Sequence, residues 1–321
     1  MLTPELLRST EPVLLHGLVR HWPMVQAARR SDAAFCDYLR RFGQDTKIGL
    51  WRGEPEIAGR FFYNAEFTGF NFQRTTQTFG ALLDELLSLN GKTEVPALYL
   101  GSTELDGSFP GLRQENELAD LNAMEPLISL WLSNRIQVAA HFDAPDNLAC
   151  VVAGRRRFTL FPPEQVANLY VGPLDFTPAG QPVSLVDLSA PDFVRFPRYA
   201  EALKTARVFE LEAGDALLIP SQWWHGVEGL DDINGLVNFW WRQSPAYMDT
   251  PLNTLMLALL TVRDLPPVQR DAWRALFDHY VFDANEQTAA HVPAAARGVL
   301  GRITPDGARQ LRSFLLNRMN R

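Results

Sequence analysis

The chain has 321 residues, of which 46% are hydrophobic and 21% charged, a composition typical of a soluble globular protein with a full core. Its formal net charge of -7 argues against a general binder of phosphate backbones, and its two cysteines, Cys36 and Cys150, form no CxxC pattern. No apolar run reaches the roughly 18 residues that a membrane span needs, and the first residues lack the pattern of a secretory leader. We therefore expect a cytoplasmic protein with reduced thiols, built as one large domain or two average ones.

The first hundred residues combine helical and strand-like patterns. Residues 13–15 form a short apolar run that favours a strand, and Ser31 begins a predicted helix that continues through Leu39. Residues 78–89 place five large apolar side chains on one stripe at helical spacing, which predicts an amphipathic helix ending at Asn90. This part of the chain is therefore expected to be a mixed α and β elaboration.

Between about residues 97 and 242 the pattern changes to short apolar runs separated by proline and glycine. Many short strands without long helices between them indicate a sandwich or a barrel. One stretch, residues 147–163, is predicted to form a hairpin with its turn at or near Ala153-Gly154. The strand-like runs are ALYLGS from residue 97, LISLWLS from 127, NLACVVAG from 147, RRFTLFPP from 156, RVFELEAG from 207, DALLIPS from 215 and GLVNFWWR from 235.

From about residue 246 helical spacing returns. Apolar residues recur every three or four positions in three segments of this tail. Some seventy residues are too few for a large core of their own, so we expect the tail to pack on the barrel or against a second copy of the chain. The predicted organisation is a β domain over residues 1–245 and a helical extension over residues 246–321 that serves to form a homodimer.

A histidine and a carboxylate lie two residues apart at the end of a strand-like run. His141 and Asp143 point to the same face if they continue that strand, because side chains alternate between the two faces. An HxD pair arises often by chance in a chain with 37 acidic residues, and its ordinary interpretation is a histidine with a neighbouring acid. A second observation is needed to make it a metal site.

That second observation is His225. It follows the segment EAGDALLIPSQWW at residues 212–224, so it lies beside an apolar strand and next to two tryptophans. Two histidines and one carboxylate on β-strands make the facial triad that binds Fe(II) in non-haem oxygenases and leaves coordination positions open. Zinc is the alternative metal, although the helical HExxH motif usual for such zinc sites is absent. His141, Asp143 and His225 are therefore the candidate metal ligands.

Three segments together resemble a known family. HFDAPDNLACVVAGRRRFTLFPPEQ, EAGDALLIPSQWWH and VNFWW resemble the cupin-like branch of the JmjC superfamily. The likeness extends from EPVLLHGLVRHWP to about Arg242, and it is similar in style to the asparaginyl hydroxylase of the hypoxia-inducible factor pathway and to bacterial cupin-like proteins. The resemblance implies a mostly β fold, the double-stranded β-helix or jelly roll of the cupins, with Fe(II) held by His141, Asp143 and His225.

The same resemblance implies a pocket for 2-oxoglutarate as co-substrate. Asn147 and Asn238 match two asparagines that line this pocket, and Tyr99 matches a tyrosine that hydrogen-bonds the far carboxylate. Two positions depart from the family pattern: Arg156 stands where a lysine pairs with that carboxylate, and Val138 stands where a threonine assists it. Arginine retains the positive charge and can bind a carboxylate through two nitrogens, whereas valine donates no hydrogen bond.

Together these features predict an Fe(II)- and 2-oxoglutarate-dependent dioxygenase that hydroxylates a protein, a peptide or a small molecule. The acidic balance gives no strong nucleic-acid signal, although related enzymes include a tRNA hydroxylase. Two alternatives stay open. One is a non-catalytic or regulatory cupin-like module that binds a metal or ligand, which Val138 and Arg156 favour; the other is a metal-dependent hydrolase or isomerase that needs no dioxygen.

Overall fold

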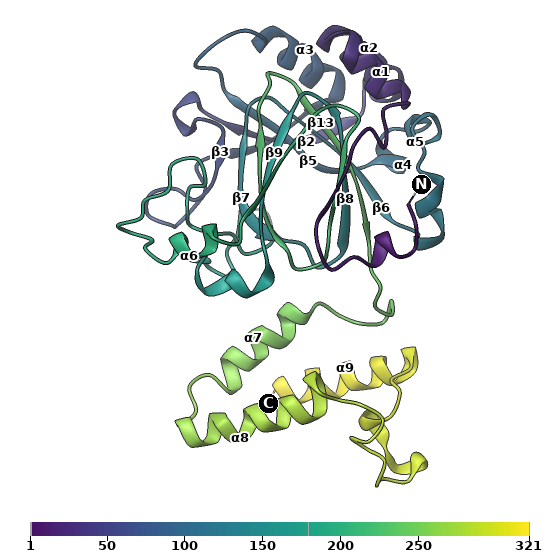
Figure 1. Ribbon diagram of the computed structural model, residues 1–321, viewed down its shortest axis with the longest axis vertical. Helices are drawn as coiled ribbons and strands as arrows, with labels where there is room; N and C mark the ends of the chain where they lie inside the picture. Colours follow the sequence, from purple (N-terminus) through teal and green to yellow (C-terminus); the bar gives the residue numbers. More distant parts are fainter. Residues whose placement is uncertain (1, 179, 321) are drawn as a thin grey trace. The chain divides into compact units, whose positions relative to one another are not determined.

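The computed structural model describes residues 2–178 and 180–320 of the chain (Figure 1). It divides into two compact units, Met1–Arg242 and Gln243–Arg321. The first unit is built from two β-sheets with helices, and the second is helical. Within the described residues, no helix combines the length and the apolarity needed to cross a membrane.

Two sheets form the first unit, and neighbouring strands in them are antiparallel except for one parallel pair, β3 with β7. From β6 onward most successive strands alternate between the two sheets, which is the winding of a jelly roll, so the predicted fold class is confirmed. The larger sheet has the order β1 (Val13–Leu15), β11 (Ala216–Ile219), β8 (Asp146–Ala153), β13 (Asn234–Trp241), β6 (Leu127–Ser133), β5 (Ala97–Glu104), β2 (Lys47–Gly53) and β4 (Gln73–Thr78). The smaller sheet has the order β10 (Arg207–Leu211), β9 (Arg156–Phe161), β12 (Trp224–Gly229), β7 (Gln137–Phe142) and β3 (Arg60–Phe61).

The predicted hairpin over residues 147–163 is wrong. β8 and β9 lie in different sheets, because both edges of β8 are already paired, with β11 and β13. The predicted turn itself is present at Gly154, which has φ +65°; a Cβ there would lie 2.4 Å from the carbonyl oxygen of Ile233. The turn therefore carries the chain from one sheet to the other, and only glycine fits it.

Helices pack on the outer face of the larger sheet. The longer ones are α1 (Pro23–Arg30), α2 (Asp32–Gly43) and α3 (Phe79–Leu89), and the shorter ones are α4 (Leu105–Ser108) and α5 (Leu112–Glu115). Helix α6 (Tyr199–Leu203) packs instead against strands of the smaller sheet. Ser31 caps α2 and Thr78 caps α3 through their hydroxyl oxygens, close to the predicted helix starts. Side chains of α1, α2 and α3 share one hydrophobic core with outward-facing residues of β8 and β13.

Both faces of strand β8 are buried, which explains why its sequence is a continuous apolar run. Leu148, Cys150 and Val152 belong to the core beneath the helices, whereas Ala149 and Val151 belong to the core inside the barrel. A strand buried on both faces loses the alternation of apolar and polar residues that marks a half-exposed strand. The inward-facing positions of β8 and β13 are the ones that reach the functional cavity.

The described part of the second unit contains three α-helices, as the sequence predicts for the tail. They are α7 (Pro251–Thr261), α8 (Pro267–Phe277), which continues into a π-helical turn over Asp278–Phe282, and α9 (Pro305–Met319). Many of its large apolar side chains are exposed, among them Leu260 at 80% and Val268 at 81%. Among the described residues of these three helices, only Ala308 is buried.

Candidate metal centre

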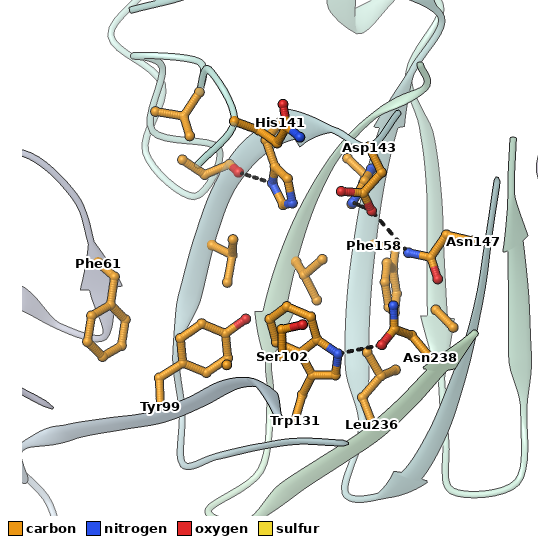
Figure 2. A pocket seen from close by; sticks show the side chains of 18 of the residues that line it. Phe61, Tyr99, Ser102, Trp131, His141, Asp143, Asn147, Phe158, Leu236 and Asn238 are labelled. Atoms are coloured by element: carbon orange, nitrogen blue, oxygen red, sulfur yellow. Dashed lines mark hydrogen bonds and ion pairs between the residues drawn. The ribbon is translucent and has the colours of Figure 1, made fainter. Parts of the chain in front are cut away.

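A cavity of about 230 Å³ lies between the two sheets of the first unit. Its walls combine apolar and aromatic side chains with a small set of polar groups, the usual composition of a small-molecule site (Figure 2). All seven residues that the sequence singles out for a site lie in these walls: Tyr99, His141, Asp143, Asn147, Arg156, His225 and Asn238.

The three candidate metal ligands meet because two strands pair side by side. His141 lies on β7, which extends farther than the sequence indicates, and His225 lies on β12, directly opposite it in the antiparallel ladder. Their ring centroids are 4.4 Å apart, and Asp143, immediately after β7, places its Oδ2 atom 3.6 Å from Nε2 of His225. One potential ligand atom from each residue lies within 4.8 Å of the others.

Both imidazoles are held by the same local device. Nδ1 of His141 is 2.9 Å from the carbonyl oxygen of Ala139, and Nδ1 of His225 is 3.0 Å from the carbonyl oxygen of Trp223. A carbonyl oxygen only accepts hydrogen bonds, so Nδ1 carries the proton and donates it. Each Nε2 therefore keeps its lone pair free for a metal. Histidine ligands of metals typically have their other ring nitrogen hydrogen-bonded in this way.

Burial keeps His225 in the neutral form that binds metals. The pKa of His225 is lowered to about 4, chiefly by removal from water and then by the nearby His141 imidazole, while Asp143 acts in the opposite direction. A metal competes with protons for imidazole nitrogen, so a low pKa leaves the ligand ready at neutral pH.

The carboxylate of Asp143 is oriented by two donors. The indole Nε1 of Trp240 donates to its Oδ2 at 3.0 Å, and the side-chain amide of Asn147 donates to the same oxygen at 3.3 Å. These bonds fix the plane of the carboxylate beside His225. Trp240 is not among the residues that the sequence singles out for the site, although its position two residues after Asn238, on the same face of β13, indicates an inward side chain.

A buried cation lies elsewhere in the cavity wall. Arg156 is 2% exposed; its Nη2 donates only a long bond of 3.5 Å to the carbonyl oxygen of Asn234, and its Nε has no partner. In the described part of the chain, no acid forms an ion pair with it. Burial lowers the pKa of Arg156 to about 10, so the group is still charged at neutral pH. A buried charge without a counter-ion is costly, and a ligand carboxylate fits it.

Further unpartnered polar atoms face the same cavity. Oδ1 of Asn147 and Nδ2 of Asn238 are buried without hydrogen bonds, while Oδ1 of Asn238 accepts one from the indole of Trp131 at 2.7 Å. Tyr99 is buried, and burial raises the pKa of its phenol, which is therefore a neutral donor. Buried polar atoms normally find partners, so these atoms indicate room for a polar ligand.

The donor set suits a redox-active or Lewis-acidic metal with open positions. Two imidazole nitrogens and one carboxylate occupy one side of a metal, which leaves the side facing the cavity for other ligands. Zinc would also accept these donors. An unpaired guanidinium lies in the same cavity and can pair with an anionic ligand.

Comparison with known proteins places the chain in a family. A model described as the cupin-like domain matches residues 2–247. "Lysine-specific demethylase JMJ31" of Arabidopsis thaliana is 34% identical over 129 residues, which cover 38% of this chain and 23% of that protein. "tRNA wybutosine-synthesizing protein 5" of Gallus gallus is 30% identical over 181 residues, covering 51% and 54%.

A longer match is less similar. "Lysine-specific demethylase 8" of Xenopus tropicalis is 24% identical over 238 residues, which cover 72% of this chain and 48% of that protein. The chain thus spans between about a quarter and about half of the length of these relatives. Their names refer to different substrates, a lysine and a tRNA.

Proposed function

The chain belongs to the cupin-like domain family, and from that premise we propose that it is an Fe(II)- and 2-oxoglutarate-dependent dioxygenase that hydroxylates its substrate. One observation carries the proposal: a single cavity holds three preoriented metal ligands together with a buried guanidinium that has no counter-ion. A metal-dependent hydrolase would need the three metal ligands but not the unpaired guanidinium. Only a ligand that is both a metal chelator and a carboxylate uses both features.

The residues of the cavity have two proposed roles, metal binding and co-substrate binding. His141, Asp143 and His225 are the proposed ligands of Fe(II), and Arg156 with Tyr99 the proposed partners of the far carboxylate of 2-oxoglutarate. Bound iron supplies the oxidative chemistry, in which dioxygen and 2-oxoglutarate yield succinate, carbon dioxide and a substrate with one new hydroxyl group. The aromatic walls exclude water from the reacting groups.

The proposed substrate class rests on the names of the relatives and on the net charge of the chain. The relatives are named for lysine demethylation and for tRNA wybutosine synthesis, which require different surfaces around the cavity. We propose a protein, peptide or small-molecule substrate, because a net charge of -7 does not favour the backbone of a nucleic acid.

We also propose that the chain forms a homodimer through its second unit. Exposed large apolar side chains are concentrated there, and monomers seldom leave such side chains uncovered in number. Light scattering on the full chain is expected to give twice the mass of 36.2 kDa. A monomeric mass at micromolar concentration would contradict the dimer.

An anaerobic titration tests the enzymatic proposal. Fe(II) and then 2-oxoglutarate are added to the protein while the weak visible charge-transfer band of the chelate is followed. The band is expected to develop to one equivalent, and admission of dioxygen with a substrate is expected to release succinate. Absence of the band in the unsubstituted protein would contradict co-substrate chelation.

The second candidate is a regulatory module without turnover. It is favoured by Val138, which lines the cavity at the position of the family's carboxylate-binding threonine. Such a module would bind Fe(II) in the same titration, yet would release no succinate on exposure to dioxygen, even without substrate, where uncoupled decarboxylation normally continues slowly. Succinate release is therefore the measurement that separates the two candidates.

A further inference from the structure

Two neighbouring connections join the sheets at the metal end of the barrel. One runs from β7 to β8 and contains Asp143, and the other runs from β11 to β12 and leads directly into His225. Each passes from one sheet to the other, so neither connection lies within a ladder of backbone hydrogen bonds. The ladder between β7 and β12 ends at the pair Phe142 and Trp224, so contacts between the connections themselves set their spacing beyond that pair. That spacing affects how Asp143 and His225 face each other.

Three hydrogen bonds join the two connections. The amide of Gln222 donates to the carbonyl oxygen of Asp143 at 2.9 Å. The hydroxyl of Ser221 donates to the carbonyl oxygen of Ala144 at 2.6 Å, and the amide of Ser221 donates to Oδ1 of Asp146 at 2.9 Å. Every donor belongs to the connection before His225, and every acceptor belongs to Asp143 or to the residues just after it.

The backbone at this junction is strained. Gln222 has φ +69°, in the left-handed region that glycine occupies freely and other residues rarely adopt. Its side chain is exposed and forms no part of the cavity wall, so packing of that side chain does not explain the conformation. The conformation does place its amide on the carbonyl of Asp143. Strain of this kind persists where surrounding contacts require it, commonly at functional sites.

We infer that Ser221 and Asp146 are positioning residues that set the distance between Asp143 and His225 and thereby the affinity of the metal centre. Neither residue is a metal ligand: they act on the backbone that carries the ligands. The inference rests on the proposed metal site and adds to it a pair of residues outside the cavity wall. Residues that orient metal ligands typically change metal affinity by about 10- to 100-fold when they are replaced.

The test is metal binding by the full chain, with Co(II) as the probe because its visible spectrum reports coordination geometry. Ser221→Ala removes the bond to Ala144, and Asp146→Ala removes the acceptor for the Ser221 amide. Each is expected to weaken Co(II) binding by about 10-fold or more and to change the spectrum. Ser221→Thr keeps the hydroxyl and Asp146→Asn keeps an acceptor oxygen, so both are expected to stay within about 3-fold of the unsubstituted chain.

A matched control separates positioning from a general loss of stability. The hydroxyl of Ser88 also donates to a backbone carbonyl, that of Glu85 in helix α3, which belongs to the outer helical layer. Ser88→Ala is expected to leave Co(II) affinity and spectrum unchanged. Gln222→Gly, which tolerates the positive φ, is expected to bind Co(II) at least as tightly as the unsubstituted chain.

The outcomes distinguish this inference from the proposed function. Co(II) affinities within 2-fold of the unsubstituted chain for both Ser221→Ala and Asp146→Ala would overturn the positioning role and leave the metal site intact. Equal losses in the alanine variants and in Ser221→Thr and Asp146→Asn would also overturn it, because the hydrogen bonds would not be the cause. Failure of the unsubstituted chain to bind Co(II) or Fe(II) would remove the metal site itself, and the positioning role with it.

Discussion

Two parts of one cavity differ in how far the hydrogen-bonding groups of their polar side chains have partners. Around the metal ligands, both histidines donate to backbone carbonyls and Asp143 accepts two hydrogen bonds. Elsewhere in the cavity wall, the guanidinium of Arg156 has one long bond and an unpartnered Nε, and Oδ1 of Asn147 and Nδ2 of Asn238 have no partner. The first part is organised before any ligand binds, whereas the second is organised for a ligand that must complete it.

The difference has an energetic consequence. A preoriented ligand set lowers the entropy lost when a metal binds, so affinity gains at no cost to the resting protein. A buried charge without a partner destabilises the resting protein, and a carboxylate that pairs with it recovers this free energy on binding. Substitution of the unpaired cation should therefore raise the stability of the ligand-free chain, whereas substitution of the metal ligands should act on metal affinity, and the predictions below depend on that contrast.

The largest effect is expected at the metal ligands. His141→Ala or Asp143→Ala removes one of three donors, so Fe(II) binding and succinate release should fall below detection. Calorimetric titration with Fe(II) under anaerobic conditions and a succinate assay measure the two quantities. His21→Ala, a change at an exposed histidine of the same unit, is the matched control and should retain both. Persistent turnover in the ligand variants would count against the assignment.

Replacement of the buried cation should separate stability from co-substrate binding. Arg156→Met removes the unpaired charge, so the ligand-free chain should unfold at a higher temperature, by about 2–4 °C for each kcal/mol gained. Affinity for 2-oxoglutarate should fall at least about 100-fold, because the charge-assisted bonds to its carboxylate are lost. Fe(II) binding should be retained.

The neighbouring arginine provides the control for that variant. Arg155 is exposed and pairs with Asp231 at 2.8 Å, so Arg155→Met should change neither the unfolding temperature by more than about 1 °C nor the affinity for 2-oxoglutarate. Differential scanning calorimetry with and without the co-substrate measures both effects. An Arg156→Met chain that unfolds earlier than the unsubstituted one would show that the guanidinium is satisfied in a way its contacts do not reveal.

The pH dependence of stability tests the state of the metal ligands. The pKa of His225 is lowered from 6.5 to about 4 in the folded chain, so between these values the unfolded chain binds a proton that the folded chain does not. Stability should therefore fall as the pH falls from 6.5 towards 4, by up to about 3 kcal/mol from this residue. In His225→Gln the loss over this range should be smaller. The free energy of unfolding of both chains is measured by urea denaturation at several pH values. An equal decrease of this free energy with falling pH in the two chains would contradict a neutral, buried imidazole.

Much of the metal centre can be predicted from the sequence, because its residues carry local signals. The HxD pair follows a strand-like run, and His225 follows a run of apolar residues that ends in two tryptophans. What the sequence does not contain is the pairing of β7 with β12, more than eighty residues apart, which sets His141 opposite His225. Register between distant strands depends on the whole sheet and leaves no periodic pattern in either strand.

Other failures have equally physical causes. Strand β4 reads QRTTQT and lies at the edge of the larger sheet, where both faces are largely open to water, so it has no apolar alternation to detect. The hairpin predicted over residues 147–163 combines two strand-like runs with a turn between them, but a turn residue does not specify which strands pair. Pro178, Gln181 and Val183 line part of the cavity but belong to no named strand or helix, and no periodic pattern in the sequence marks them.

The smallest effect is expected at Val138, which the sequence resemblance matches to a threonine of the family. Val138 lies on β7, half-buried, with its side chain in the cavity wall. Val138→Thr adds a hydroxyl at that point with little change in volume. If the part of the cavity around Arg156 is incomplete until 2-oxoglutarate binds, one more donor should raise the affinity for it by about 3- to 10-fold, the effect of one net hydrogen bond. Val227, opposite Val138 in the ladder and also in the cavity wall, offers a matched control: Val227→Thr adds the same hydroxyl on the next strand and should give no gain. A gain in both variants would mean that added polarity anywhere in the cavity suffices, and a gain in neither would mean that Arg156 and Tyr99 already satisfy the carboxylate.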